Sequence, residues 1–192
     1  MRGFKAIIKF EFRSPYSQSR HISTPKLERE SGADYEERTW RERMHTDKKG
    51  FVFIPPSAFK NGLSEAAKYL NKQIPGKGKS TYTKHFEAGV LVMDPVPLPI
   101  KAEDVPGEWL FVPSDGRRGG GKRVEKCFGK IDDVGELEAT IYILDPIITK
   151  EVFADVLTYF SAFIGLGRFR PRNNGWYGRF EIKDIQWIEE DF

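Results

Sequence analysis

The chain of 192 residues contains one cysteine and three histidines. A single cysteine excludes a disulfide framework within the chain and fits a reducing compartment. The histidines, His21, His45 and His85, lack the short spacings of zinc ligands, so we expect no metal site and no cofactor. Cys127 has no paired histidine beside it, so we expect it to be a small strand residue and not a nucleophile.

Long apolar runs are missing as well. No stretch approaches the roughly 20 apolar residues that cross a bilayer, and the start, MRGFKAIIKFEF, alternates apolar and polar residues, unlike a signal peptide. We therefore expect a cytoplasmic protein without a membrane partner. The length fits a single domain over residues 1–192 that is large enough to bury a core.

A phosphate loop of the nucleotide-hydrolase type is also missing. Gly78, Lys79 and Ser80 match the end of such a loop, but Gly76 and Lys77 precede them where a strand with the required spacing is needed. Nucleotide hydrolysis is therefore not expected.

Acidic residues are nearly absent from three segments. Residues 72–85, 117–126 and 168–179 hold thirteen lysines and arginines and one acid, Glu125, whereas the remaining chain has eighteen basic and twenty-seven acidic residues. An anionic ligand requires such segregation, provided that the segments meet in space. Sequence alone does not show that they meet.

The stretch over residues 163–182 combines glycines with arginines. Glycine permits positive φ and leaves amides uncovered, and arginine presents a planar donor fork suited to phosphate. The stretch is predicted either to cradle phosphates or to be a solvated glycine-rich turn.

Apolar periodicity predicts the elements of the fold. Strands are expected near residues 4–12, 51–54, 86–93, 109–112, 124–128, 137–144 and from 177 onward. Ser57 is expected to cap a helix to about residue 70, and Thr149 a helix to about 163. A charged helix is possible over 34–44, and the four prolines of 94–108 argue against a strand there.

Without insertions at about 14–50 and 94–130, the order becomes strand, helix, strand, strand, helix, strand. This order predicts an α+β, ferredoxin-like (RRM-like) core with an antiparallel sheet and two helices on one face. The residues around 116–121 are expected at the flexible basic tip of a projecting hairpin. The open face of such a sheet can receive nucleic acid.

Two motifs resemble a known superfamily. The run GFVFIPPSAFKNGLSEAAKY, residues 50–69, resembles the YIPGSSLKGALR strand-to-helix turn of the repeat-associated mysterious proteins (RAMP superfamily) of CRISPR effector complexes. The matched positions are Ile54, Pro55, Ser57, Phe59, Lys60 and Gly62. The C-terminal IGLGRFRPRNNGWYGRFEI is similar to the superfamily's glycine-rich loop and terminal strand. Pro56 replaces the usual glycine, and the arginine that closes the first motif is absent.

The resemblance implies a backbone-type subunit that grips single-stranded guide RNA, together with copies of itself and other effector subunits. The residues expected to contact RNA are Ser57, Lys60, Lys77, Lys79, Lys84, Arg117, Arg118, Lys122, Arg123, Arg168, Arg170, Arg172, Trp176 and Arg179. Tyr82, Phe86 or Trp176 could stack on unpaired bases.

Plainer interpretations stand beside these assignments. Lys60 can be a solvated helix residue, and at least one of Trp176 and Tyr177 is expected in the core. Arg38, Arg41 and Arg43 interleave with Glu36, Glu37 and Glu42, so we interpret them as a self-paired surface.

Other functions are open at this point. Some RAMP subunits cut RNA with an aspartate before the IPGSS-like turn, and Asp34 and Asp47 lie in the matching region, where either could position a metal or a water. A stand-alone, even viral, single-strand-binding protein would use the same loops and aromatics. A capsid or scaffold protein could place the basic loops against acidic neighbours. The residues favour binding over catalysis.

Overall fold

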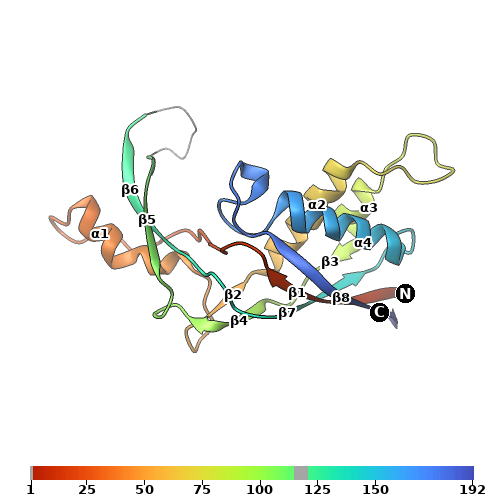
Figure 1. Ribbon diagram of the computed structural model, residues 1–192, viewed down its shortest axis with the longest axis horizontal. Coiled ribbons are helices and arrows are strands. Elements are labelled where there is room, and N and C mark those ends of the chain that lie inside the picture. The colour runs from red at the N-terminus through yellow and green to blue at the C-terminus, as the bar shows by residue number, and fades with distance from the viewer. Residues whose placement is uncertain (1, 115–120) are drawn as a thin grey trace.

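The computed structural model describes residues 2–114 and 121–192, and within them it is an α+β protein with antiparallel sheets and four α-helices (Figure 1). A four-stranded sheet has the order β3-β7-β1-β8. Its strands are β1 (Arg2–Phe12), β3 (Val90–Leu91), β7 (Leu137–Ile143) and β8 (Phe180–Asp191). All three pairings in this sheet are antiparallel.

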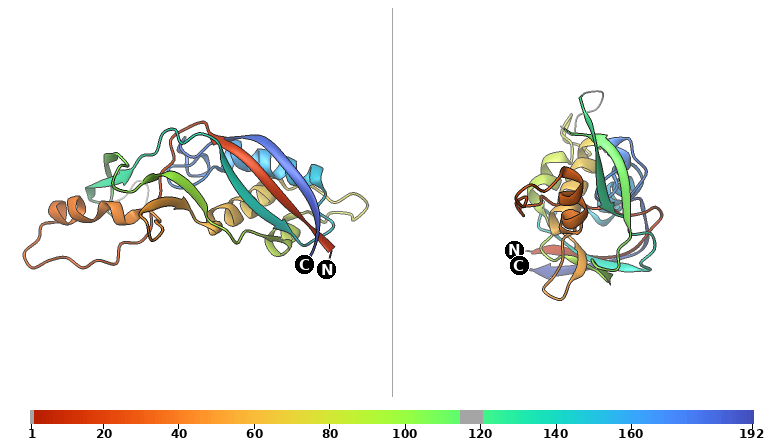
Figure 2. Two further views of the ribbon diagram at one scale, coloured as in Figure 1. Left: turned by 90° about the horizontal axis from the view of Figure 1, so that it is seen from below. Right: turned by 90° about the vertical axis from the view of Figure 1, so that its left-hand side faces the viewer.

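Three of the α-helices lie on one face of this sheet (Figure 2). They are α2 (Pro56–Leu70), α3 (Thr83–Gly89) and α4 (Lys150–Tyr159), the last continuing as a π-helical segment, η2 (Phe160–Ile164). Thr149 caps α4 as predicted, because its hydroxyl accepts a hydrogen bond from the amide of Val152. Within the described ranges no helix is long and apolar enough to cross a bilayer.

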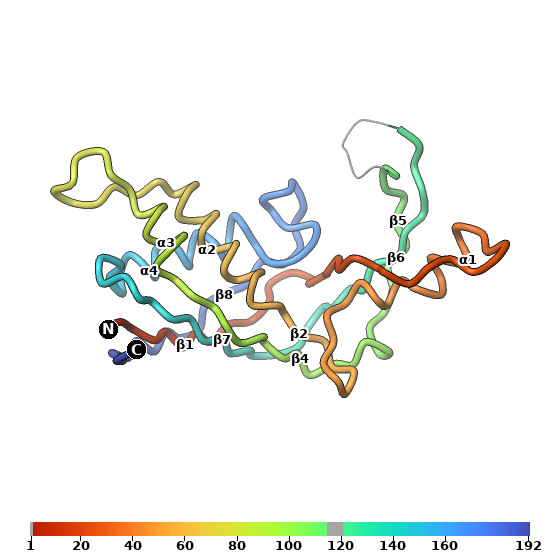
Figure 3. Tube along the Cα trace, turned by 180° about the vertical axis from the view of Figure 1, so that it is seen from behind, coloured from red at the N-terminus to blue at the C-terminus, as the bar shows by residue number. Residues whose placement is uncertain are grey.

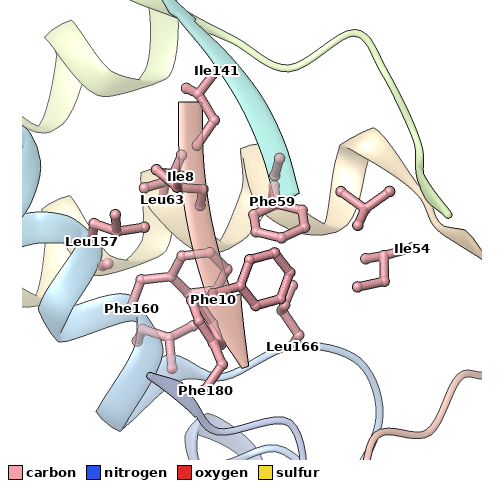
Figure 4. Close-up of a cluster of buried hydrophobic side chains, with 14 of the residues drawn as sticks. Ile8, Phe10, Ile54, Phe59, Leu63, Ile141, Leu157, Phe160, Leu166 and Phe180 are labelled. Atoms are coloured by element: carbon pink, nitrogen blue, oxygen red, sulfur yellow. The ribbon is translucent and has the colours of Figure 1, made fainter. Parts of the chain in front are cut away.

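Aromatic side chains fill the space between the sheet and the helices (Figure 4). Phe10 of β1, Phe59 of α2, Phe160 of η2 and Phe180 of β8 are almost completely buried. Their ring centroids lie 5.1 to 6.3 Å apart, mostly in edge-to-face geometry. Gly62 lets η2 approach α2, because a Cβ at this position would lie 2.1 Å from the Phe160 ring.

A second part of the molecule extends away from this sheet core (Figure 3). Strand β2 (Phe51–Ile54) pairs with β4 (Val96–Lys101), and β5 (Gly107–Pro113) pairs with β6 (Arg123–Gly129) as the predicted hairpin. Helix α1 (Gly32–Thr39) and the 3₁₀ helix η1 (Trp40–Arg43) lie beside the root of that hairpin. We call α1, η1 and the β5–β6 hairpin the arm.

A buried ion-pair network joins the two halves of the arm. Glu36 of α1 is fully buried, and its carboxylate accepts from the Arg43 guanidinium at 3.0 Å, the Lys126 ammonium at 2.7 Å and the Cys127 amide at 2.9 Å. Burial alone would raise the pKa of Glu36, but these hydrogen bonds outweigh it and the pKa is lowered. The sequence predicted a self-paired surface for Arg43. Its pairing with Glu36 is confirmed, but its position on the surface is wrong because both side chains are buried in this network.

Three other predictions about the elements are corrected. β4 is a strand despite Pro97 and Pro99, because a two-stranded ladder leaves one edge of β4 without hydrogen-bond partners. Phe86 lies in α3 and not in a strand. The N-cap of α2 is Pro55, so Ser57 is in the first turn and makes no cap.

Candidate nucleic-acid interface

The glycine- and arginine-rich loop between η2 and β8 is tied to the chain that follows β1. The Arg168 amide donates to the Ser17 carbonyl at 2.7 Å, and the Gly178 amide to the Pro15 carbonyl at 2.7 Å. Gly167 has φ +73°, and a Cβ there would lie 2.2 Å from the Ser17 carbonyl oxygen. Glycine is therefore needed for the close approach of the two segments.

The Arg168 side chain lies over two aromatic rings. Its guanidinium stacks 3.7 Å from the centroid of the Phe128 ring and 4.7 Å from that of Phe169, and it donates to the Ser19 hydroxyl at 3.1 Å. Its Nε is buried and has no hydrogen-bond partner. Burial and the nearby charge of Arg43 lower its pKa, yet an arginine keeps its proton at neutral pH. The side chain thus retains a positive charge that no acid neutralises within residues 2–114 and 121–192.

Arg168 lines a pocket of about 280 Å³. Tyr16, Gln18, Ser19, His45, Pro55, Ala58 and Gly167 form the rest of its wall. Gln18 is fixed in the wall because it donates to the Phe53 carbonyl and accepts from the His45 amide, both at 2.8 Å. Burial, assisted by the charge of Arg20, lowers the pKa of the His45 imidazole, which is therefore neutral at pH 7.

The pocket lies at the N-terminal end of α2, to which Pro55 and Ala58 belong. The macrodipole favours an anion at a helix start. The amides of α2 add little to this, because Pro55 and Pro56 have no N–H and the Ala58 amide donates to the Pro55 carbonyl at 2.9 Å. Arg168 and the positive end of the α2 dipole thus border the same cavity. Their combination is suited to a phosphate group.

Three of the predicted RNA-binding cations are already used inside the fold. Arg170 and Arg172 both bind the carboxylate of Glu65 in α2, at 3.0 and 2.7 Å. The Lys60 ammonium donates to the carbonyls of Phe86 and Glu87 in α3, and burial lowers its pKa. Lys60 therefore holds α2 against α3 instead of pointing into solvent.

The other predicted contact residues are exposed but spread out. Lys77, Lys79 and Lys84 are exposed in and beside the loop between α2 and α3, which lies at the end of the long axis opposite the arm (Figures 1 and 3). Lys122 and Arg123 are exposed where β6 begins, and Arg179 just before β8. Arg117 and Arg118 lie outside the described residues. Within residues 2–114 and 121–192, the three basic segments do not merge into one furrow, and they lie on the helix side of the sheet rather than on its open face.

The residues predicted to stack on bases also differ in exposure. Trp176 is 57% exposed and free to stack, whereas Tyr82 and Phe86 are buried in the core. Tyr177 is buried and donates its hydroxyl to Glu108 at 2.7 Å, which joins the loop to the hairpin. The prediction that one of Trp176 and Tyr177 belongs to the core is confirmed.

The acids considered for catalysis have local structural roles. Asp34 completes the capping box of α1 with Ser31, and Asp47 accepts from the amides of Lys49 and Phe51 at 2.8 and 2.9 Å. Among the described residues, no group of three or more His, Cys, Asp or Glu side chains could hold a metal ion. Cys127 is buried in β6, and burial raises the pKa of its thiol to about 11, so it is not a thiolate at neutral pH.

The sequence analysis missed the segment after β1 as part of this site. Tyr16, Gln18 and Ser19 supply one wall of the pocket, and His45 another. Nothing in their local pattern indicated this, because the contacts are tertiary: Ser19 accepts from Arg168, 149 positions away, and Gln18 is held by Phe53 and His45. The run SPYSQSR, rich in serine, was the one visible feature.

The fold of the chain is similar to that of several solved structures, in agreement with the resemblance that the two RAMP-like motifs predicted. One match is to a chain of the Type III-B Cmr-beta complex bound to cognate target RNA, with a TM-score of 0.56 and 12% identity. That match covers 98% of this chain but only 61% of the other. Cmr6 from Pyrococcus furiosus matches with a TM-score of 0.51 and 14% identity, over 94% of this chain and 99% of Cmr6.

These similarities confirm the predicted resemblance to RAMP-type backbone proteins at the level of fold. No protein-family model matches the sequence, and no curated protein sequence matches it.

Proposed function

We propose that this protein is an RNA-binding, RAMP-like subunit that holds single-stranded guide RNA in a CRISPR-like ribonucleoprotein. In this proposal the whole chain is one domain around a ferredoxin-like core, and its partners are copies of itself or other effector subunits. The sheet order β3-β7-β1-β8 and the fold similarity to Cmr subunits support it.

The observation that carries the proposal is the unpaired charge of Arg168. A half-buried guanidinium is costly unless an anion completes its coordination. Arg168 forms no ion pair within residues 2–114 and 121–192, two aromatic rings hold its guanidinium plane, and the start of α2 lines the same pocket. A backbone phosphate of RNA supplies the missing acceptor, and the exposed Trp176 offers a stacking surface for a base.

Binding of fluorescently labelled single-stranded RNA, measured by anisotropy over a series of salt concentrations, tests the proposal. Arg168→Ala should weaken binding about tenfold or more, since a charged hydrogen bond to phosphate is lost. It should also reduce the slope of log K against log salt by about 0.7, the contribution of one phosphate in a single strand. Lys150→Ala is the matched control, because Lys150 is an exposed cation at the start of α4, far from the loop.

Two results would contradict the proposal: wild-type affinity that does not depend on salt, or equal affinities of Arg168→Ala and Lys150→Ala. Arg168→Lys separates charge from geometry, because lysine keeps the charge but cannot stack or donate as a planar fork. Assembly on long RNA distinguishes the subunit from the stand-alone binder, which would bind RNA of any length as a monomer. If the wild type cleaves the bound RNA and Asp34→Ala or Asp47→Ala abolishes the cleavage, the protein is an endoribonuclease instead.

A further inference from the structure

A second set of cations lies next to the Arg168 pocket, along the inner side of α1 and η1. Two cavities of about 480 and 280 Å³ share Arg20 and His21 in their walls. Arg43 lines the larger cavity, and Arg41 and Glu42 line the smaller one. We call these joined cavities the arm groove. Ser19 lines both the larger of these cavities and the Arg168 pocket, so the two sites are neighbours.

The walls of the arm groove are fixed by hydrogen bonds at several points. The Arg20 amide donates to the Arg43 carbonyl at 2.8 Å, which ties the floor to η1. Further along, the Thr24 hydroxyl donates to Glu42 and the Tyr35 hydroxyl to the Thr24 carbonyl, both at 2.7 Å. The groove is therefore preformed, and a ligand need not order it on binding.

Two arginines in the groove have no acidic partner within the described ranges. Arg43 is neutralised by Glu36, whereas Glu42 keeps its negative charge, accepts from the Thr24 hydroxyl and forms no ion pair with Arg20 or Arg41 within the described ranges. Arg20 forms no ion pair, and Arg41 stacks 4.1 Å from the centroid of the Trp40 ring without a carboxylate. This stacking fixes the plane of the Arg41 guanidinium and leaves its donors available.

We infer that the arm groove is a second phosphate site, in which Arg20 and Arg41 bind the backbone of the same single-stranded RNA that leaves the Arg168 pocket past Ser19. This inference rests on the proposed RNA binding and extends it to Arg41, which was interpreted from the sequence as part of a self-paired surface, and to Arg20. The ligand class is a phosphodiester chain, because guanidinium groups present paired donors that match phosphate oxygens.

The test compares the double variant Arg20→Ala/Arg41→Ala with Arg168→Ala and the control Lys150→Ala on a uridine 16-mer. The double variant is expected to weaken binding about tenfold or more and to lower the salt slope by about 1.4, the value for two single-strand phosphate contacts. Both arginines are exposed, so the melting temperature should stay near that of the wild type. Should the double variant fold poorly, the two single variants and Arg20→Gln/Arg41→Gln replace it.

The outcomes separate the two proposals. If Arg168→Ala weakens binding and the double variant behaves like Lys150→Ala, the arm groove is not an RNA site, while the Arg168 pocket stands. If the wild type does not bind the 16-mer at low salt, both proposals fail. If the double variant loses affinity without a change in salt slope, its arginines act on the fold and not on phosphates, and the inference is overturned.

Discussion

The sheet core and the arm are stabilised by different kinds of contact. Between the four-stranded sheet and helices α2 and α4, the buried groups are almost all apolar, with Phe10, Phe59, Phe160 and Phe180 at the centre. In the arm, a few apolar residues at the root, such as Trp40 and Met44, accompany a buried carboxylate with three charged or polar donors.

This difference determines how each region responds to change. Apolar contacts in the core are numerous, non-directional and independent of pH and salt. The Glu36 network depends on each partner being present and charged, because a buried ion that loses its counter-ion is strongly destabilising. The arm groove and the Arg168 pocket both border this network, so we expect RNA binding to be more sensitive to it than the fold is.

The largest expected effect is that of Glu36→Gln. It leaves Arg43 buried without a counter-ion. The free energy of unfolding of the arm should therefore fall by about 3–5 kcal/mol. Hydrogen exchange should show loss of protection in α1, η1 and the β5–β6 hairpin, with β1, β7 and β8 still protected. Glu37→Gln is the matched control, since Glu37 is the exposed neighbour on the same helix.

The same network predicts a pH dependence of the arm. The pKa of Glu36 is lower in the folded protein than in the unfolded chain. Its stabilisation is therefore fully present above the unfolded pKa of about 4.3 and is lost as the pH falls through the lower folded value. Two results would contradict this account. One is hydrogen-exchange protection of the arm that stays constant from pH 7 down to the pH at which the core unfolds. The other is equal exchange rates in Glu36→Gln and Glu37→Gln.

A smaller effect is expected in the core for Gly62→Ala. Alanine favours a helix over glycine by about 1 kcal/mol, but the new Cβ would lie 2.1 Å from the Phe160 ring. Overpacking of this kind costs about 1–3 kcal/mol, so we expect net destabilisation by denaturant unfolding. Asn61→Ala, one position earlier and exposed, should be neutral or stabilising. A stabilised Gly62→Ala would show that η2 moves away from α2 without cost.

The contrast between the regions also explains how much the sequence alone could reveal. The alternating pattern of residues 4–12 and the spacing around Leu63 and Phe153 gave correct strands and helices, because each follows from local burial on one face. Strand β4 was missed because proline statistics describe central strands, and β4 pairs on one side only. Phe86 was misassigned because a short apolar run fits a helix and a strand equally well.

The candidate site was predictable in part. The glycine-rich loop was singled out from its composition, and its link to an RAMP-like fold is supported by two solved structures. Which arginines remain unpaired was not predictable, because Glu65 reaches Arg170 and Arg172 across more than 100 residues, while Arg41 lacks the partner that its neighbouring glutamates suggested. Pairing depends on tertiary contacts that no local pattern encodes.

The smallest effect on stability, with the most direct bearing on binding, is expected for Glu65→Gln. The pairs of Glu65 with Arg170 and Arg172 are part-exposed, so their loss should cost only about 0.2–1 kcal/mol. Two guanidiniums beside the Arg168 loop would then be free for phosphate, and the repulsion between the carboxylate and RNA would be removed. We expect RNA affinity to rise several-fold and the salt slope to steepen by up to about 1.4.

Glu189→Gln is the matched control. It removes the same charge near the C-terminal end of β8 and should change neither the RNA affinity nor the salt slope. Unchanged affinity with a lowered melting temperature would mean that Arg170 and Arg172 serve the fold and that Arg168 alone faces the ligand.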